Sequence, residues 1–285
     1  MSDIALENEG AASALASSAA RRSLGRIGAM ILRYWWLLVG SWPRILSVLY
    51  WPVVSMMMWG FVQKFIQSSG PSAMSTAMSF LVGAVILWDV LFRGQIGFSM
   101  SFFEEIWSRN LGHLLVSPLR LWEFILALMT ASIARAVLSL IPASLLAIWM
   151  FNFSVYAMGP ALGLFFLALI TFGWALGLFV SGLVMRFGQS AEEIAWGIIF
   201  TILPLCGVYY PTTVLPPAIR WLSYALPPKY IFDAMRSILR NQRFDAHLLI
   251  TAFSLDAVYI ALAAGAFRFF LGQARDRGIL LSVGE

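Results

Sequence analysis

Residues 207–236 read GVYYPTTVLPPAIRWLSYALPPKYIFDAMR, a stretch that is apolar for a loop yet rich in proline. Its five prolines are Pro211, Pro216, Pro217, Pro227 and Pro228. Because proline lacks the N–H that a helix interior needs, the stretch cannot form one continuous helix. A short helix is predicted to begin at Pro216-Pro217 and end before Pro227, and a second is predicted over 228–243. Broken backbone at membrane depth is tolerated only where protein buries it or it lines a cavity, so this segment is a candidate for function.

The rest of the chain has the composition of a membrane protein. It is 60% hydrophobic and 12% charged over 285 residues, with a mean hydropathy of +0.82. These values exclude an ordinary soluble domain and predict an all-α polytopic membrane protein. Six spans are predicted, at 45–64, 79–99, 119–150, 158–184, 191–210 and 246–270. The third carries Pro142, which should kink it.

The residue types that bind metals or form disulfides are scarce. Cys206 is the single cysteine, which excludes an intramolecular disulfide and a thiolate metal cluster. The two histidines, His113 and His247, are far apart in the sequence and lack ligand spacing. No metal site is therefore expected, and no pattern indicates a nucleic-acid partner.

The distribution of lysine and arginine predicts the orientation. With the N-terminus inside, twelve of these residues fall on the cytoplasmic side and six outside, which favours cytoplasmic placement of both termini. Residues 1–20 are mostly Ala, Ser and acidic, and we expect a disordered cytosolic tail before a single transmembrane domain over 21–285. Residues 22–42 combine arginines with tryptophans and Tyr34, which predicts a helix in the cytoplasmic interface that Pro43 breaks.

The connection between the second and third spans, 104–118, is predicted to form a short amphipathic helix. Its apolar face would hold Trp107, Leu111, Leu114 and Leu115. Glu105 and Arg109 are spaced as an i,i+4 ion pair. Ser117 would cap the next helix, with Pro118 in its first turn. Such a helix could transmit force from a cytosolic partner, or it could be a simple connection.

Two groups of residues carry a resemblance to a known family. The pattern Leu111-x-x-Leu-Leu-Val-Ser-Pro-Leu119, after an acidic pair, resembles the cytoplasmic loop of type-2 ABC exporter permeases. Arg109-Asn110 replaces the Gly-Thr that usually precedes the first leucine. The opening stretch shows the family's motifs in order, as Tyr210-Pro211, Leu215-Pro216-Pro217, Pro227-Pro228-Lys229-Tyr230 and Asp233-Ala-Met-Arg236. The resemblance covers nearly the whole chain.

The resemblance implies two functional regions. The first is a coupling helix that docks on an ATPase, with Glu104, Glu105, Trp107, Arg109, Asn110, Leu111, Leu114, Leu115 and Ser117. The second is an outer gate of two re-entrant helices, with Tyr210, Pro211, Leu215, Pro216, Pro217, Pro227, Tyr230, Asp233, Arg236 and Arg240. The resemblance further implies two permease chains, expected to be a homodimer, with two ATPase chains.

The chain lacks the residues of an ATPase. Its only lysines, Lys64 and Lys229, follow Gln63 and Pro228 and cannot belong to a phosphate-binding loop that ends in Gly-Lys-Ser/Thr. No enzyme activity, catalytic residue or cofactor is expected on this chain, and ATP and Mg would bind the partner. The expected function is ATP-driven export of an amphiphilic substrate (lipid, glycolipid, polysaccharide or drug) across a bacterial inner membrane.

Charged residues within the predicted spans leave alternatives open. Asp89 and Arg93 are spaced as an i,i+4 pair, and Arg135 and Asp256 are placed near mid-depth. Structural pairing is one interpretation. A proton relay is another, and it would make the protein a proton-coupled secondary transporter. A third hypothesis is a membrane anchor for another complex that transports nothing.

The second helix of the opening stretch is predicted to carry a basic stripe. Lys229, Arg236, Arg240 and Arg243 align within about 60°, and Asp233 can pair with Arg236 or Arg240. The stripe could anchor to lipid headgroups or guide an anionic amphiphile that leaves the path. Elsewhere, the four-residue spacing of Gly173, Gly177 and Ser181 predicts close helix packing.

Overall fold

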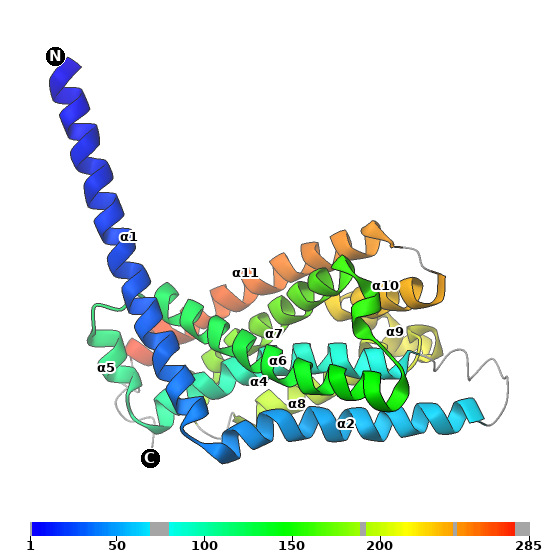
Figure 1. Cartoon of the computed structure of the whole chain (residues 1–285). Helices are drawn as coiled ribbons and strands as arrows, with labels where there is room; N and C mark the ends of the chain where they lie inside the picture. Colours follow the sequence, from blue (N-terminus) through cyan, green and yellow to red (C-terminus); the bar gives the residue numbers. More distant parts are fainter. Residues whose placement is uncertain (1, 69–79, 189–191, 242–243, 277–285) are drawn as a thin grey trace.

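The structure, a computed structural model, describes residues 2–68, 80–188, 192–241 and 244–276 (Figure 1). Within these ranges the chain forms helices and turns without a strand, which confirms the all-α prediction. The long helices are α1 (Ser2–Val39), α2 (Trp42–Ser68), α4 (Leu81–Trp107), α6 (Leu121–Phe151), α7 (Pro160–Phe187) and α11 (Ala246–Asp276). The shorter ones are α5 (Leu111–Val116), η1 (Val155–Met158), α8 (Glu192–Leu205), η3 (Thr212–Val214), α9 (Pro217–Tyr224) and α10 (Pro227–Asn241).

Five helices are long and apolar enough to cross a membrane: α2, α4, α6, α7 and α11. They contain 27–31 residues, which at 1.5 Å per residue exceeds the roughly 30 Å of a hydrocarbon core. The predicted span at 191–210 contains only the 14-residue α8, about 21 Å long, and the count of six spans is not confirmed. α8 is short because the chain turns just beyond Pro204, with Gly207 at φ +69°. α6 continues as one helix with Pro142 inside it, and the kink stays a prediction.

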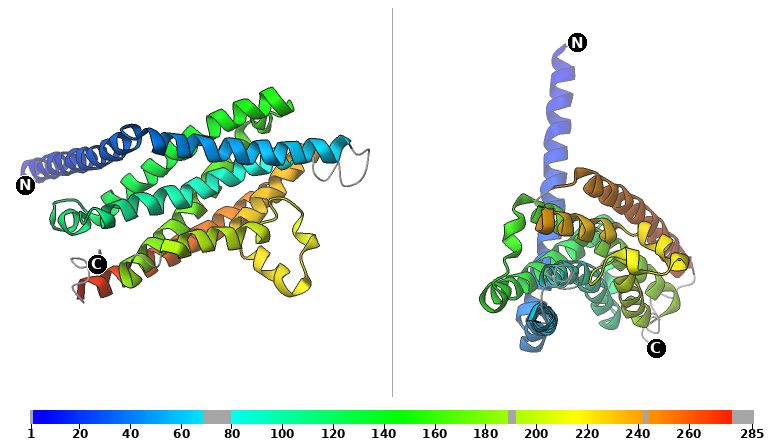
Figure 2. Two further views of the ribbon diagram at one scale, coloured as in Figure 1. Left: turned by 90° about the horizontal axis from the view of Figure 1, so that it is seen from below. Right: turned by 90° about the vertical axis from the view of Figure 1, so that its right-hand side faces the viewer.

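α4 occupies the centre of the bundle and packs against α2, α6 and α7 (Figure 2). Of its most apolar window, 89% is buried, against 22% for α2 and α11 on the outside. The close contact of α4 with α7 depends on small residues. A Cβ at Gly173 would lie 2.8 Å from the carbonyl oxygen of Leu91, and one at Gly177 would lie 3.0 Å from Phe98. Ser181 is buried, so the predicted small-residue contact is confirmed.

α1 leaves the bundle at a steep angle, at the end that also holds α5 and the last turns of α11 (Figure 1). It ends at Val39, where Gly40 and Ser41 turn the chain, and Pro43 lies in the first turn of α2. The break between α1 and α2 thus lies before Pro43 and not at Pro43 as predicted, because proline is favoured in the first turn of a helix. Residues 2–20, expected as a disordered tail, belong to α1 in the structure, since alanine has the highest helix propensity.

The proline-rich stretch lies at the opposite end of the bundle (Figure 2). It forms η3, α9 and α10, with Pro217 in the first turn of α9 and Pro227 at the start of α10. The two short helices expected from the proline positions are therefore present. α10 packs on α11 and α7, and its buried face includes Ile231, Ala234 and Met235. Re-entry of these helices into a membrane stays a prediction.

Candidate functional site

The α4–α5 connection differs from the predicted helix over 104–118. α4 continues through Trp107, so Glu104, Glu105 and Trp107 belong to the long helix. The chain then turns at Ser108–Asn110, where Arg109 has φ +52°, and α5 covers only Leu111–Val116. The single amphipathic helix was therefore wrong: a left-handed residue divides the segment between the end of α4 and a six-residue helix.

Glu105, fully buried at the end of α4, connects three parts of the chain. Its carboxylate accepts hydrogen bonds from the Tyr34 hydroxyl at 3.0 Å and from Asn110 Nδ2 at 2.7 Å. It also forms an ion pair with Arg33 at 2.7 Å. Burial, together with the adjacent Glu105 carboxylate, raises the pKa of the Tyr34 hydroxyl. The predicted i,i+4 pair of Glu105 with Arg109 required one helix that contains both residues, but α4 ends at Trp107.

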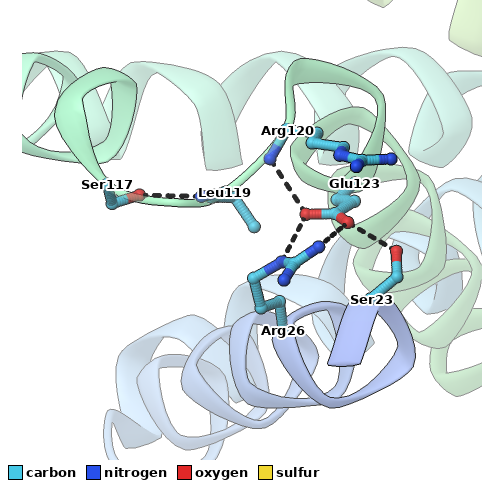
Figure 3. Close-up of polar contacts among 6 residues, drawn as sticks. All are labelled: Ser23, Arg26, Ser117, Leu119, Arg120 and Glu123. Carbon is cyan, nitrogen blue, oxygen red and sulfur yellow. Dashed lines mark hydrogen bonds and ion pairs between the residues drawn. The ribbon is translucent and has the colours of Figure 1, made fainter. Parts of the chain in front are cut away.

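Glu123, fully buried in the first turn of α6, forms a second connection to α1 (Figure 3). Arg26 donates to both carboxylate oxygens, from Nε at 2.8 Å and from Nη2 at 2.5 Å, and Ser23 donates from Oγ at 2.5 Å. The backbone N–H of Arg120 donates to the same carboxylate at 2.9 Å. The bond to Glu123 raises the pKa of Arg26. α1 is thereby attached to the segment after α5 as well as to the segment before it.

Ser117 does not cap α6 as predicted. α6 begins at Leu121 with Arg120 as its N-cap, while Ser117 follows the last residue of α5. Its hydroxyl accepts the N–H of Leu119 at 3.3 Å and donates to the Leu114 carbonyl at 2.7 Å. The hydroxyl therefore stabilises the turn between α5 and α6. Leu119 and Arg120 separate Pro118 from the start of α6, so Pro118 does not lie in the first turn of that helix.

The predicted apolar face of the coupling segment is divided between core and surface. Leu111 is buried and Leu114 is half-buried, whereas 44% of Trp107 is exposed. Val116 is 90% exposed, the highest value among the large apolar residues of the described chain. Leu115 lies in α5, and its side chain is outside the described part. Trp107 and Val116, the last residues of α4 and α5, are therefore the exposed apolar residues of this segment.

The sequence interpretation missed the residues of α1 that hold this region. These are Ser23, Arg26, Arg33 and Tyr34, together with Glu123 of α6. A signal was available, because Arg26 and Arg33 are seven residues apart and hence on one face of a helix. Glu123 is also a lone acid in the first turn of an otherwise apolar helix.

At the other end of the bundle, much of the predicted basic stripe of α10 is engaged within the protein. Asp233 forms ion pairs with Lys229 at 3.1 Å and with Arg236 at 2.6 Å. Arg236 also donates to the carbonyl of Gly207 at 2.5 Å, which joins α10 to the turn after α8. The predicted pairing of Asp233 with Arg236 is confirmed. Arg240 is exposed, and Arg243 lies outside the described residues.

The remaining residues of the predicted outer gate mostly shape the backbone. Pro211 precedes η3 and Pro216 is the N-cap of α9. The buried Leu215 accepts hydrogen bonds on its carbonyl from Arg220, with Nη2 at 2.8 Å. The hydroxyls of two tyrosines donate to backbone carbonyls, Tyr210 to Pro204 and Tyr230 to Tyr224.

The four charges predicted within the spans do not form one continuous network. Asp89 and Arg93 form the predicted pair at 3.4 Å, and Ser139 donates to Asp89 at 2.6 Å. Arg135 donates to the backbone carbonyl of Gly97 at 2.8 Å. Asp256 is buried, and neither of its oxygens has a hydrogen-bond partner in the described ranges. A continuous relay of these groups is absent from that part of the chain.

The arrangement of long apolar helices, α5 and the proline-broken segment agrees with a family comparison. The profile of the ABC-2 type transporter family matches residues 27–239, from the middle of α1 into α10. The chain belongs to the ABC-2 type transporter family. Members of the family are transmembrane permease subunits that normally pair with an ATPase subunit. The match includes the α4–α5 turn and the connection of Glu105 to Arg33 and Tyr34, whereas Ser23 and Arg26 lie just before its first residue.

Individual relatives of this ABC-2 family chain are distant. The inner membrane transport permease YadH of Escherichia coli strain K12 is 26% identical over 163 residues, which is 56% of this chain and 61% of the relative. The proteins of the same name from Escherichia coli O157:H7 and Shigella flexneri give the same values. The chain thus spans 61% of the length of these curated relatives.

Proposed function

We propose that this chain is the permease subunit of an ATP-driven exporter in a bacterial inner membrane. The observation that carries the proposal is the family match over residues 27–239. The name of the relatives, inner membrane transport permease, supports the location. In this proposal the α5 end and both termini face the cytoplasm, as the distribution of lysine and arginine favours. Two permease copies, a homodimer, would work with two copies of a separate ATPase that binds ATP and Mg.

The geometry around α5 supports a coupling role. An ATPase that docks on the exposed surface of Val116 and Trp107 would press on a short helix with rigid neighbours. Displacement of α5 would pass to α4 through the turn at Asn110 and to α6 through the turn at Ser117. Because Glu105 and Glu123 connect these turns to α1, the interfacial helix would move with them.

The outer segment supports a gate at the other end of the path. α10 packs its apolar face on α11 and α7, and Arg236 joins it to Gly207 and also pairs with Asp233. In this proposal an amphiphilic substrate leaves between two permease chains beside these helices. Lys229 and Arg236 are already engaged by protein groups, which favours structural and lipid-anchoring roles of the basic stripe over guidance of the substrate.

The test is co-expression with a candidate ABC ATPase subunit from the same organism, followed by co-purification and ATP hydrolysis assays in lipid nanodiscs. Val116→Glu places a charge on the proposed docking surface. Val214→Glu is the matched control, because Val214 is a valine of η3 that is 70% exposed at the opposite end. We expect Val116→Glu to abolish co-purification and Val214→Glu to retain it.

Other results would contradict the proposal. Loss of the ATPase only in Val214→Glu would place docking at the wrong end of the molecule. Transport driven by a pH gradient without ATP would support the proton-coupled alternative. A chain that binds another complex but moves no substrate would support the anchor hypothesis.

A further inference from the structure

A half-open cavity of about 200 Å³, with charged side chains in its lining, lies in the α5 half of the bundle between α2, α4 and α6. Three arginines line it, one from each helix: Arg44, Arg93 and Arg135. Its volume holds several water molecules at about 30 Å³ each. A second hollow of about 330 Å³ adjoins it and shares Arg44, Glu104 and Trp107. Because the side chains of Arg44 and Trp107 are partly exposed, this second hollow forms the mouth.

The charges around the cavity are unequal. Arg44 pairs with Glu104 at 3.2 Å, and Arg93 pairs with Asp89 at 3.4 Å. Arg135 is 8% exposed and donates to the Gly97 carbonyl, but it forms no ion pair in the described part of the chain. A buried cation without a counterion is costly, because its hydration is lost without compensation. The cavity is therefore suited to an anion.

The surroundings indicate an anion that carries acyl chains. On α2, the helix that carries Arg44 and Ser47 of the cavity, Leu46, Tyr50 and Trp51 are exposed. From Glu104 to Arg93, α4 advances eleven residues, so the arginines extend about 16 Å inward from the mouth. A headgroup could enter this line of arginines while its chains lie on the apolar surface of α2. Guanidinium groups bind phosphate with paired hydrogen bonds, which favours phosphate as the anionic group.

We propose that this cavity binds the phosphate headgroup of an anionic amphiphile from the membrane leaflet at the α5 end. Arg135 supplies the unpaired charge, and Arg44 at the mouth admits the headgroup. The proposal rests on the proposed function in one respect, which is that this leaflet is the cytoplasmic one. A lipid with a phosphate headgroup then enters the cavity of each permease chain from the cytoplasmic leaflet. This is the leaflet from which an exporter takes its substrate.

The experiment measures lipid binding to the purified full chain without any ATPase. Phosphatidylglycerol is titrated in detergent and bound lipid is counted by native mass spectrometry, with phosphatidylcholine and inorganic phosphate as separate probes. Arg135→Gln removes the unpaired charge, and Ser47→Asp places a carboxylate in the cavity. Arg135→Lys keeps the charge. Arg22→Gln is the matched control, because Arg22 is an exposed arginine of α1 outside the cavity.

We expect one saturable phosphatidylglycerol site per chain. Its affinity falls at least tenfold in Arg135→Gln and in Ser47→Asp, which corresponds to about 1.4 kcal/mol or more. Arg22→Gln retains it, and Arg135→Lys, which keeps the charge but loses the paired guanidinium donors, weakens it less than Arg135→Gln does. Phosphatidylcholine binds at least tenfold more weakly than phosphatidylglycerol because it carries no net negative charge. Inorganic phosphate at the same concentration does not displace the lipid.

Unchanged phosphatidylglycerol binding in Ser47→Asp overturns the proposal even if Arg135→Gln does not fold. An equal loss in Arg22→Gln shows general attraction to a basic surface and also overturns it. Displacement by inorganic phosphate alone shows a site for the free anion and overturns the lipid assignment. Because the assay contains no ATPase, absence of binding leaves the proposed exporter function standing, and failure of ATPase coupling leaves lipid binding standing.

Discussion

Arg26 of α1 holds both carboxylate oxygens of Glu123 in α6, at 2.8 and 2.5 Å, although 97 residues separate the two in sequence. Glu105 makes the corresponding connection at the other side of α5, to Arg33 and Tyr34. The coupling segment therefore lies between two buried carboxylates, and both accept hydrogen bonds from side chains of α1. α1 is held in place by these polar contacts in addition to its apolar packing.

The first prediction concerns the Glu123 connection. Glu123→Gln keeps the size of the side chain but removes the charge that binds Arg26. We expect amide hydrogen exchange over residues 20–30 to rise about tenfold, because local opening of α1 becomes less costly. Hydrogen-exchange mass spectrometry in nanodiscs measures it. Glu193→Gln is the control, since Glu193 is an exposed acid in the first turn of α8. Equal exchange of α1 in both variants would refute the proposed attachment.

The second prediction tests the contact of α4 with α7. A methyl group in Gly173→Ala would press on the backbone of α4, with the Leu91 oxygen at 2.8 Å and the Gln95 nitrogen at 2.9 Å. We expect the free energy of unfolding to fall by about 1–3 kcal/mol, the usual cost of overpacking. Gly163→Ala in the same helix has nothing within 4 Å and should be neutral or slightly stabilising. Thermal unfolding in detergent distinguishes the two, and equal midpoints would contradict the packing.

The third prediction uses Cys206, the single cysteine, as a native reporter of the outer turn. Cys206 is fully buried next to Gly207, whose carbonyl accepts a hydrogen bond from Arg236. Arg236→Gln removes charged hydrogen bonds that contribute about 1.5–3 kcal/mol each, so we expect maleimide labelling of Cys206 to become roughly tenfold faster or more. Arg240→Gln changes an exposed residue of the same helix and should leave the rate unchanged. Faster labelling in Arg240→Gln alone would contradict the role of Arg236.

The fourth prediction compares two acids within the long helices, the half-buried Asp89 and the buried Asp256. Asp89→Asn leaves the buried Arg93 without its counterion, and we expect a loss of about 3–5 kcal/mol in stability. Asp256→Asn removes an ionisable group that has no partner in the described ranges, and stability should be unchanged or higher. Thermal unfolding measures both effects. If Asp256→Asn instead abolishes transport while the fold remains stable, Asp256 has a functional role and the proton-coupled alternative gains support.

Local features of the sequence were sufficient for several parts of the structure. The apolar composition indicated the long helices, and the prolines indicated where α9 and α10 begin, because proline constrains its own backbone. The Asp89–Arg93 pair could be predicted because both residues lie on one helix, four positions apart. The small residues of α7 predicted a close helix contact because they too are spaced four positions apart on one helix. They did not indicate that α4 would be the partner.

By itself, then, the sequence determined the long apolar helices, that they suit a membrane, the helix starts at the prolines, and the order of motifs that indicates the family. Only the tertiary structure decided which buried charges meet. Glu105 and Glu123 bind α1, Arg135 binds the carbonyl of Gly97, and Asp256 has no partner in the described chain. The physical reason is that these contacts join residues far apart in sequence, so they depend on how the helices pack, whereas helix formation and proline breaks depend on neighbouring residues.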